Sequence, residues 1–155
     1  MEFCLLADDP SAADTVARWY YDQWCRASGR HSFQFVRENV SSATCRLGAP
    51  MIVLAKQKGE LVGAAELKIR EMEMFPEYEF WLGGVYVREQ ARGQGVASAL
   101  VKEVLRQARR AGIAMLYLQT EDLSGGLYTQ FGFRHLEQVD SKGVLVTVMV
   151  AETGV

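Results

Sequence analysis

The segment from Val85 to Ala97 reads VYVREQARGQGVA, and it decides the fold. An apolar, β-branched run enters a short loop that contains Gly93 and Gly95, and the residues that follow have the period of an amphipathic helix. A strand that enters a helix through such a turn leaves several backbone N–H groups free and directed at one spot. The glycines let an anion approach the backbone closely, and Arg92 adds a positive charge. The segment therefore predicts a phosphate-binding turn in an α/β protein.

Two well-known phosphate loops do not fit this segment. A Walker loop needs Gly-Lys-Ser or Gly-Lys-Thr, which the chain lacks. A dinucleotide loop GxGxxG would begin at Gly93, but Ser98 stands where its last glycine belongs, and no acidic residue ends a following strand at the expected place. Taken alone, the turn could also be an ordinary strand-to-helix connection without a ligand.

The rest of the chain predicts a single α/β (α+β) domain over residues 1–155 with a mixed sheet. The chain is too short for two well-buried domains, and its 49% hydrophobic content supplies a core. We expect strands at 3–6, 51–56, 61–69, 78–87, 114–118, 133–139 and 144–150, and helices ending near 28 and spanning 32–40, 96–111 and 124–131. The resulting order is βααβββαβαββ.

Composition excludes several classes of protein. Seventeen Lys and Arg against nineteen Asp and Glu give a net charge of −2, which argues against a nucleic-acid binder. The apolar runs fall short of the roughly 18 residues that a membrane span needs, and the first residues do not resemble a secretory signal. The cysteines Cys4, Cys25 and Cys45 form no CxxC pair, so we expect no metal site and no disulfide framework. These features favour a cytoplasmic protein, whereas the sequence leaves open whether it is a monomer or a homodimer.

A second motif lies about thirty residues after the turn, where Leu127-Tyr128 is followed by Phe131-Gly132-Phe133. The sequence RGQGVA at 92–97 and this later motif, at this spacing, resemble the GNAT superfamily of N-acetyltransferases. The family signature is Arg or Gln, two residues, Gly, one residue, and then Gly or Ala. The two motifs span residues 85–133, and the order of elements extends the resemblance over nearly the whole chain.

The resemblance implies a mixed sheet in which two central parallel strands, at 78–87 and 114–118, splay apart. It also implies acetyl-CoA as co-substrate, with its pantetheine arm paired to the first of these strands and its pyrophosphate on the turn. The cofactor-binding residues would be Val85, Val87, Arg92, Gly93, Gln94, Gly95, Val96 and Ala97. Acyl transfer in this family passes directly from thioester to amine, so no cysteine nucleophile is required.

The resemblance also suggests catalytic residues. Tyr128 matches the family's tyrosine, which acts as general acid toward the departing CoA thiolate. Many members carry a general-base glutamate on the strand before the phosphate turn, but Gly83 and Trp81 occupy those places here. The candidates for the base are Glu79, which shares their alternating face if no bulge intervenes, Glu121 and its neighbour Asp122. A chain of water molecules is an alternative.

The acceptor implied by the resemblance is a primary amine of a small molecule or a peptide. Residues 88–110 carry six bases and two acids, net +4, and would surround phosphates; residues 60–81 carry six acids and two bases, net −4, and would favour a cationic amine. Either block could instead be ordinary solvated surface. We expect Trp19 and Trp24 to divide between the core and the acceptor pocket.

Two other functions stay open at this stage. A non-catalytic module with the GNAT fold could bind or sense acyl-CoA without turnover, which the missing glutamate would permit. An unrelated α/β nucleotide-binding protein is the other alternative.

Overall fold

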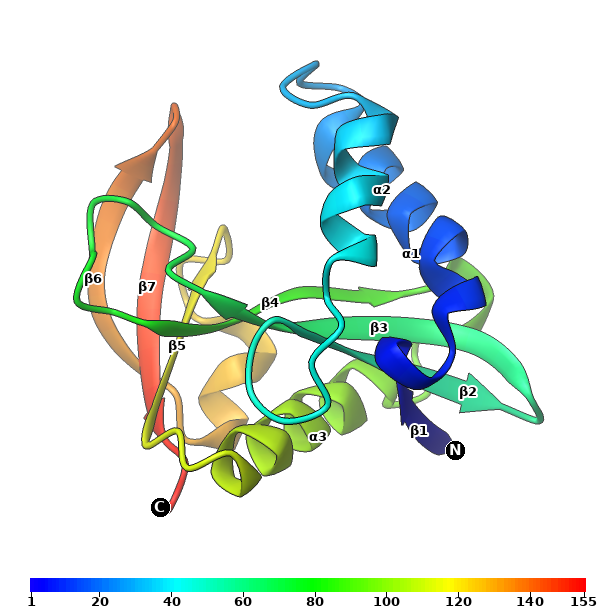
Figure 1. The fold of residues 1–155 in the computed structure, drawn as a ribbon. Helices are drawn as coiled ribbons and strands as arrows, with labels where there is room; N and C mark the ends of the chain where they lie inside the picture. The colour runs from blue at the N-terminus through cyan, green and yellow to red at the C-terminus, as the bar shows by residue number, and fades with distance from the viewer.

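The computed structural model describes all residues from Met1 to Val155, and it contains one mixed sheet of seven strands (Figure 1). The strand order is β1-β2-β3-β4-β5-β7-β6. The strands are β1 (Glu2–Leu5), β2 (Met51–Gln57), β3 (Glu60–Ile69), β4 (Phe80–Val87), β5 (Met115–Thr120), β6 (Arg134–Ser141) and β7 (Val144–Glu152). The α-helices are α1 (Ala13–Tyr20), α2 (Phe33–Ser41) and α3 (Val96–Arg110). The expected α/β fold is therefore confirmed.

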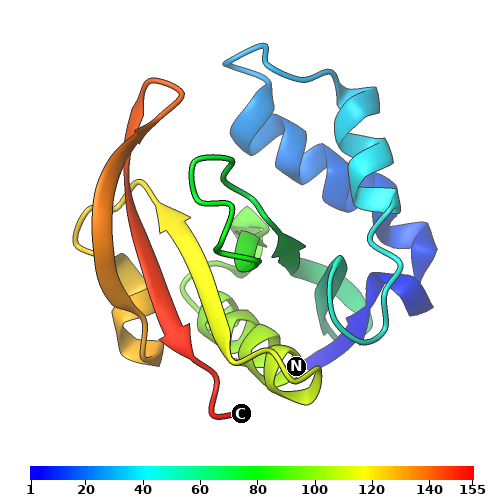
Figure 2. The same cartoon turned by 60° about the vertical axis from the view of Figure 1, so that its left-hand side comes forward.

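Helices cover both faces of the sheet: α3 lies on one face, and α1 and α2 lie on the other (Figures 1 and 2). Successive side chains of a strand point to opposite faces. Accordingly, Ala65 and Leu67 of β3 pack in one cluster with Leu100 of α3, whereas Ala64 packs in a second cluster with Val16 of α1. The sheet thus separates two cores, and both are built from alternate residues of the same strands.

The helix α3 follows the phosphate turn and has a continuous apolar side. Leu100, Val101 and Val104 are fully buried along its fifteen residues. It begins after Gly95, whose φ is 80°, and it ends before Gly112, whose φ is 77°. Although α3 is the longest helix, neither it nor any other helix is long and apolar enough to cross a membrane.

The parallel strands β4 and β5 touch at a single register position. Trp81 of β4 pairs with Tyr117 of β5, whereas every other neighbouring pair of strands forms a ladder of several residues. Beyond this position the two strands separate toward their carboxyl ends. The expected splay of the two central strands is confirmed, and it opens the sheet next to the turn into α3.

A β-bulge interrupts β4 immediately before the opening. Ala64 of β3 pairs with Tyr86 of β4, and Glu66 pairs with Gly83. An advance of two residues along β3 therefore matches an advance of three residues along β4. The extra residue lies at Gly84, whose positive φ of 56° favours glycine. The bulge breaks the alternation between Gly83 and Tyr86, whereas Glu79, Trp81 and Gly83 all precede it.

Two contacts join the two halves of the molecule on the α1–α2 side. The loop between β3 and β4 lays Tyr78 on Tyr117 of β5, with ring centroids 4.1 Å apart. Farther out, the Arg30 guanidinium donates to the Lys142 carbonyl at 2.6 Å, which links the α1–α2 connection to the turn between β6 and β7. The two halves of the sheet, β1 to β4 and β5 to β7, are thus linked by these contacts on the face that α1 and α2 cover.

The helix α2 has a side-chain cap that can be tested. Ser32 Oγ accepts a hydrogen bond from the Phe35 N–H at 3.1 Å. Because the cap satisfies a donor that the helix itself cannot, we expect Ser32→Ala to lower the free energy of unfolding by about 1 kcal/mol. Denaturant unfolding measures this loss. Ser41→Ala, at the exposed last residue of α2, is the control and should change it by less than about 0.5 kcal/mol; equal losses would contradict the role of the cap.

Candidate active site

A cavity of about 350 Å³ opens where β4 and β5 separate. Its wall combines the end of β4, the turn and first residues of α3, and the segment Gly126–Phe131, with Gln23 and Trp24 at its edge. Seven of the eight residues predicted to bind the cofactor line this cavity. The exception is Gln94, whose side-chain oxygen lies 3.5 Å from the amide nitrogen of Gln57.

The last residues of β4 turn their backbone polar groups toward the opening. The Arg88 N–H donates to the Val62 carbonyl at 2.9 Å, so the adjacent pair, Val87 with Gly63, is a non-hydrogen-bonded pair of the antiparallel ladder. The N–H and C=O of Val87 therefore point away from β3. An extended ligand can pair with this edge as a further strand would.

The turn into α3 presents uncapped backbone donors to the same cavity. No side chain caps the helix, and its first N–H groups have no partner within the helix. Gly93 and Gly95 both have positive φ, and a methyl group on either would meet no atom within 4 Å. Ser98 lines the cavity as well and was missed by the sequence analysis, although it stands in the last position of the GxGxxG spacing. This arrangement suits a diphosphate.

Arg92 closes the end of β4 with its side chain. Its Nε donates to the Val87 carbonyl at 2.8 Å, and its guanidinium lies 5.4 Å from the centroid of the Tyr86 ring. These contacts fix the guanidinium at the wall of the cavity. Its remaining N–H groups are free to bind an anion.

Tyr128 enters the cavity from the segment that follows β5. Its ring packs nearly perpendicular to Phe133, with centroids 6.1 Å apart. Burial raises the pKa of the Tyr128 phenol, and the nearby charge of Glu71 raises it further. The phenol therefore stays protonated at neutral pH and can donate a proton into the cavity.

The model of the acetyltransferase (GNAT) family matches residues 13–133, which include the turn, the cavity and Tyr128. The chain belongs to the GNAT family. It is therefore an enzyme of the GNAT N-acetyltransferase type, which uses acetyl-CoA. A search of curated proteins finds no significant match.

Solved GNAT structures share the fold over their whole length. An aminoglycoside 6'-N-acetyltransferase complexed with coenzyme A is 15% identical, with a TM-score of 0.76, over 99% of this chain and 97% of that one. A ribosomal-protein-alanine N-acetyltransferase from Brucella melitensis is 17% identical, with a TM-score of 0.74, over 98% and 99%. An N-acetyltransferase from Staphylococcus aureus Mu50 is 16% identical, with a TM-score of 0.76, over 99% of both chains. At these identities the likeness shows the fold alone.

The carboxylates predicted as the general base lie away from the cavity of this GNAT protein. Glu79 precedes β4, is half exposed, and pairs with Arg70 at 3.3 Å. Glu121 is exposed in the bend after β5, and Asp122 beside it accepts hydrogen bonds from Ser124. None of the three lines the cavity, so the structure does not bring them together with Tyr128.

Three other charged residues, which do not line the cavity either, gather beside Gly83 and Gly84 and were missed by the sequence analysis. Lys68 Nζ lies 2.8 Å from Glu71 Oε1 and 3.6 Å from Glu66 Oε2. Gln119 of β5 donates to the other oxygen of Glu71 at 3.1 Å, so Glu71 connects β3 to β5 across β4. The available signal was the sequence Glu66-Leu67-Lys68, which places two charges within a strand that is otherwise apolar.

The two tryptophans of the α1 region have different surroundings. Trp19 stacks on Tyr86 with centroids 5.1 Å apart and packs against the α1–α2 core. Trp24 is 44% exposed, lines the cavity and meets the edge of the same Tyr86 ring. It lies in a π-helical turn, Tyr21–Cys25, that continues α1, and such turns are frequent at functional sites.

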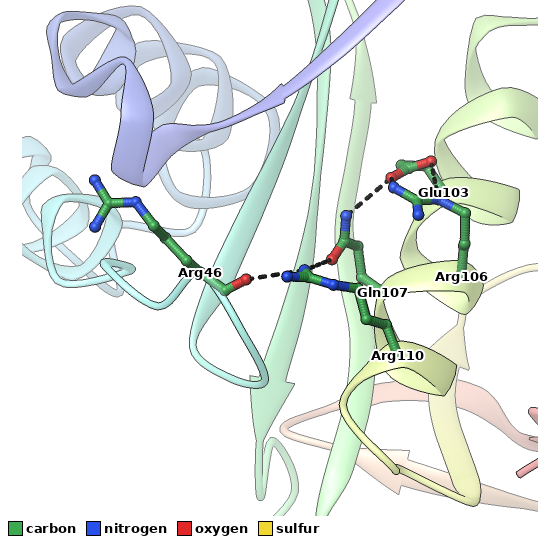
Figure 3. A network of polar contacts seen from close by, with 5 residues as sticks. All are labelled: Arg46, Glu103, Arg106, Gln107 and Arg110. Atoms are coloured by element: carbon green, nitrogen blue, oxygen red, sulfur yellow. Dashed lines mark hydrogen bonds and ion pairs between the residues drawn. The ribbon is translucent and has the colours of Figure 1, made fainter.

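The basic block surrounds the phosphate turn only in part: Arg92 lines the cavity there, whereas the bases at the end of α3 do not. Arg106 pairs with Glu103, and Arg110 donates to the Gln107 side chain at 3.2 Å and to the Arg46 carbonyl at 3.3 Å (Figure 3). These residues lie on the last turns of α3, and a helix of this length is roughly 20 Å long. The net charge of residues 88–110 was a poor guide, because most of these residues form α3 and the two ends of this helix lie far apart.

Proposed function

We propose that the protein transfers the acetyl group of acetyl-CoA directly to a primary amine of a small molecule or a peptide. The observation that carries this proposal is the cavity itself. It brings together the free backbone edge of β4, the uncapped start of α3 and a protonated Tyr128. A binding module would need the first two features but not a buried phenol beside the place where the extended ligand ends.

The residues present fit the CoA moiety at each of its parts. The backbone groups of Val85 and Val87 would bind the amides of the pantetheine arm, and the first N–H groups of α3 with Arg92 would hold the diphosphate. The bound co-substrate supplies an acetyl thioester. A backbone N–H near Val85 would polarise its carbonyl, and Tyr128 would donate its proton to sulfur as the C–S bond breaks.

The acidic loop between β3 and β4 supports a cationic acceptor. Glu73 and Glu77 are exposed there and form no ion pair, whereas Glu60 and Glu79 of the same block pair with Arg88 and Arg70. Exposed carboxylates attract ammonium groups until salt screens them, with a Debye length of about 8 Å at physiological ionic strength.

Salt should therefore weaken apparent binding of the acceptor. We expect the KM for n-butylamine, a cation at neutral pH, to rise several-fold from low to high ionic strength. Initial rates at saturating acetyl-CoA measure it. Aniline, which is neutral, is the control and should show a constant KM. Equal responses of the two amines would contradict attraction by this loop.

The function itself is tested by amine-dependent release of CoA thiol. A panel would contain an aminoglycoside, a peptide with N-terminal alanine, spermidine and n-butylamine, with the acetylated product identified by mass spectrometry. We expect thiol and N-acetyl product to form in equal amounts with at least one of these amines. Tight binding of acetyl-CoA in calorimetry without any turnover across the panel would instead favour an acyl-CoA-sensing module.

A further inference from the structure

Two glycines of β4 lie beside the cavity, and oxygens from three other elements cover them closely. A methyl group on Gly84 would lie 2.8 Å from Glu66 Oε2 of β3 and 2.8 Å from Tyr20 Oη of α1. A methyl group on Gly83 would lie 3.0 Å from Glu71 Oε1 of the β3–β4 loop. At Gly83, one of the two places where many relatives carry the general base, β4 has no side chain here, and residues of neighbouring elements cover the strand.

Two of these oxygens are poorly satisfied. The Tyr20 hydroxyl is buried without any hydrogen-bond partner, in a residue that is 6% exposed. The Glu66 side chain is 14% exposed, and its cationic neighbour, Lys68 Nζ, is 3.6 Å away. An unpaired buried polar group is costly, so the Tyr20 hydroxyl next to a loosely paired Glu66 carboxylate indicates a site for a hydrogen-bond donor.

The charges around this spot favour a donor that is also a cation. Burial lowers the pKa of the Lys68 ammonium, but the charges of Glu71 and Glu66 outweigh burial and hold the pKa above its usual range. Lys68 is thus a fixed charge, bound at 2.8 Å by Glu71. One ammonium between two carboxylates leaves one negative charge, and Glu66 is the carboxylate that Lys68 holds more loosely.

We propose that Glu66 and the Tyr20 hydroxyl bind the acceptor as a primary alkylammonium, and that Glu66 is the general base that deprotonates it. This inference rests on the proposed acetyl transfer. Gly84 precedes Val85, which lines the cavity, so a nitrogen held over Gly84 lies beside the place proposed for the thioester. The acceptor nitrogen would then approach from the α1 side of the sheet.

The proton balance is complete with the residues named. Glu66 takes one proton from the ammonium and later releases it to solvent. The neutral amine then attacks the carbonyl carbon, the N–C bond forms, and the C–S bond breaks. Tyr128 gives its proton to the thiolate and recovers one from the nitrogen, which becomes an amide. The products are the N-acetyl amine, CoA thiol and one released proton.

The pH dependence follows from the groups that face Glu66. Burial raises the pKa of the Glu66 carboxyl; the Lys68 ammonium opposes this shift, and the Glu71 carboxylate adds to it. Tyr20, from α1, is uncharged at neutral pH because burial raises its pKa well above the usual value. Below its own pKa Glu66 is protonated and cannot accept a proton, so kcat/KM of the wild type should fall on the acid side.

The decisive variant is Glu66→Gln, assayed over pH with n-butylamine, whose ammonium has a pKa near 10. At neutral pH we expect kcat/KM to fall by about 10²–10⁴, the contribution of a general base. The loss should shrink tenfold per pH unit toward the pKa of the amine, because solvent then supplies the free amine. The wild type, which binds the ammonium, should keep its activity over this range and lose it only above the pKa of the amine.

A second variant separates function from folding. Tyr20→Phe removes only a hydroxyl without a partner, so stability should not fall. The KM for n-butylamine should rise roughly ten- to a hundredfold, the effect of one hydrogen bond to a charged group, while the KM for acetyl-CoA stays constant. Glu152→Gln, exposed at the end of β7, is the control for loss of one carboxylate.

The outcomes distinguish this inference from the proposed function. A wild type that acetylates no amine overturns the proposed function. A working wild type whose Glu66→Gln variant keeps the wild-type rate and pH profile overturns the inference alone. The inference would also be overturned if the loss of kcat/KM that shrinks with rising pH appeared in Glu79→Gln or Glu121→Gln and not in Glu66→Gln. That carboxylate would then be the general base.

Discussion

Tyr128→Phe is expected to lower kcat by about 10²–10⁴, the range typical of a lost general acid. The phenol sits in the wall of the cavity, and burial keeps it protonated by raising its pKa. A free thiol has a pKa near 8.5, so expulsion of an unprotonated thiolate at neutral pH is only mildly unfavourable. The loss is therefore bounded and does not amount to inactivation.

Steady-state kinetics with acetyl-CoA as varied substrate distinguish the possible roles of Tyr128. Phenylalanine keeps the ring and its packing on Phe133, so folding and CoA affinity should change little. A fall in kcat at constant KM identifies a transition-state role. A rise in KM at constant kcat would make Tyr128 a binding residue, and no change would remove it from the mechanism. Tyr21→Phe, a phenol outside the cavity, is the matched control.

Gly95→Glu is expected to weaken CoA binding by roughly a thousandfold. Two like charges about 4 Å apart repel by about 4 kcal/mol at an effective dielectric constant of about 20, and every 1.4 kcal/mol is tenfold in Kd. The new carboxylate would stand at the uncapped start of α3, where the diphosphate is proposed to bind. Isothermal titration calorimetry with CoA measures the change.

Two controls isolate the charge from the backbone strain at Gly95. Gly95→Gln has nearly the same size and the same unfavourable positive φ but no charge. Gly112→Glu carries the same charge and a similar strain at the other end of α3, where φ is 77°. We expect both controls to bind CoA far better than Gly95→Glu. If folded Gly95→Glu binds CoA as the wild type does, the diphosphate does not lie on this turn.

The parts of the fold that sequence predicted well are encoded locally. The turn into α3 needs only a β-branched run, two glycines and a helical period, all within residues 85–111. The hairpin of β2 and β3 follows from Lys58 and Gly59, both of which have positive φ. Tyr128 was found because its motif is also contiguous.

The parts that sequence did not predict depend on how distant segments pair. The bulge at Gly84 is defined by the register of β4 against β3, which no single strand reveals. Glu66 and Tyr20 stand 46 positions apart and meet only because α1 crosses that bulge. Glu79 was a candidate because it is close in sequence to β4, but its side chain pairs with Arg70 and does not line the cavity.

The free edge of β4 has a consequence for the solubility of the protein. Unpaired N–H and C=O groups at the edge of a strand are a template for pairing with another polypeptide, and natural sheets usually cover them. Here the edge lies inside the molecule, where β5 touches β4 at one position and the Arg92 side chain donates to the Val87 carbonyl. A bound pantetheine arm would occupy the same groups. CoA would then block strand pairing with another polypeptide, in addition to carrying the acyl group.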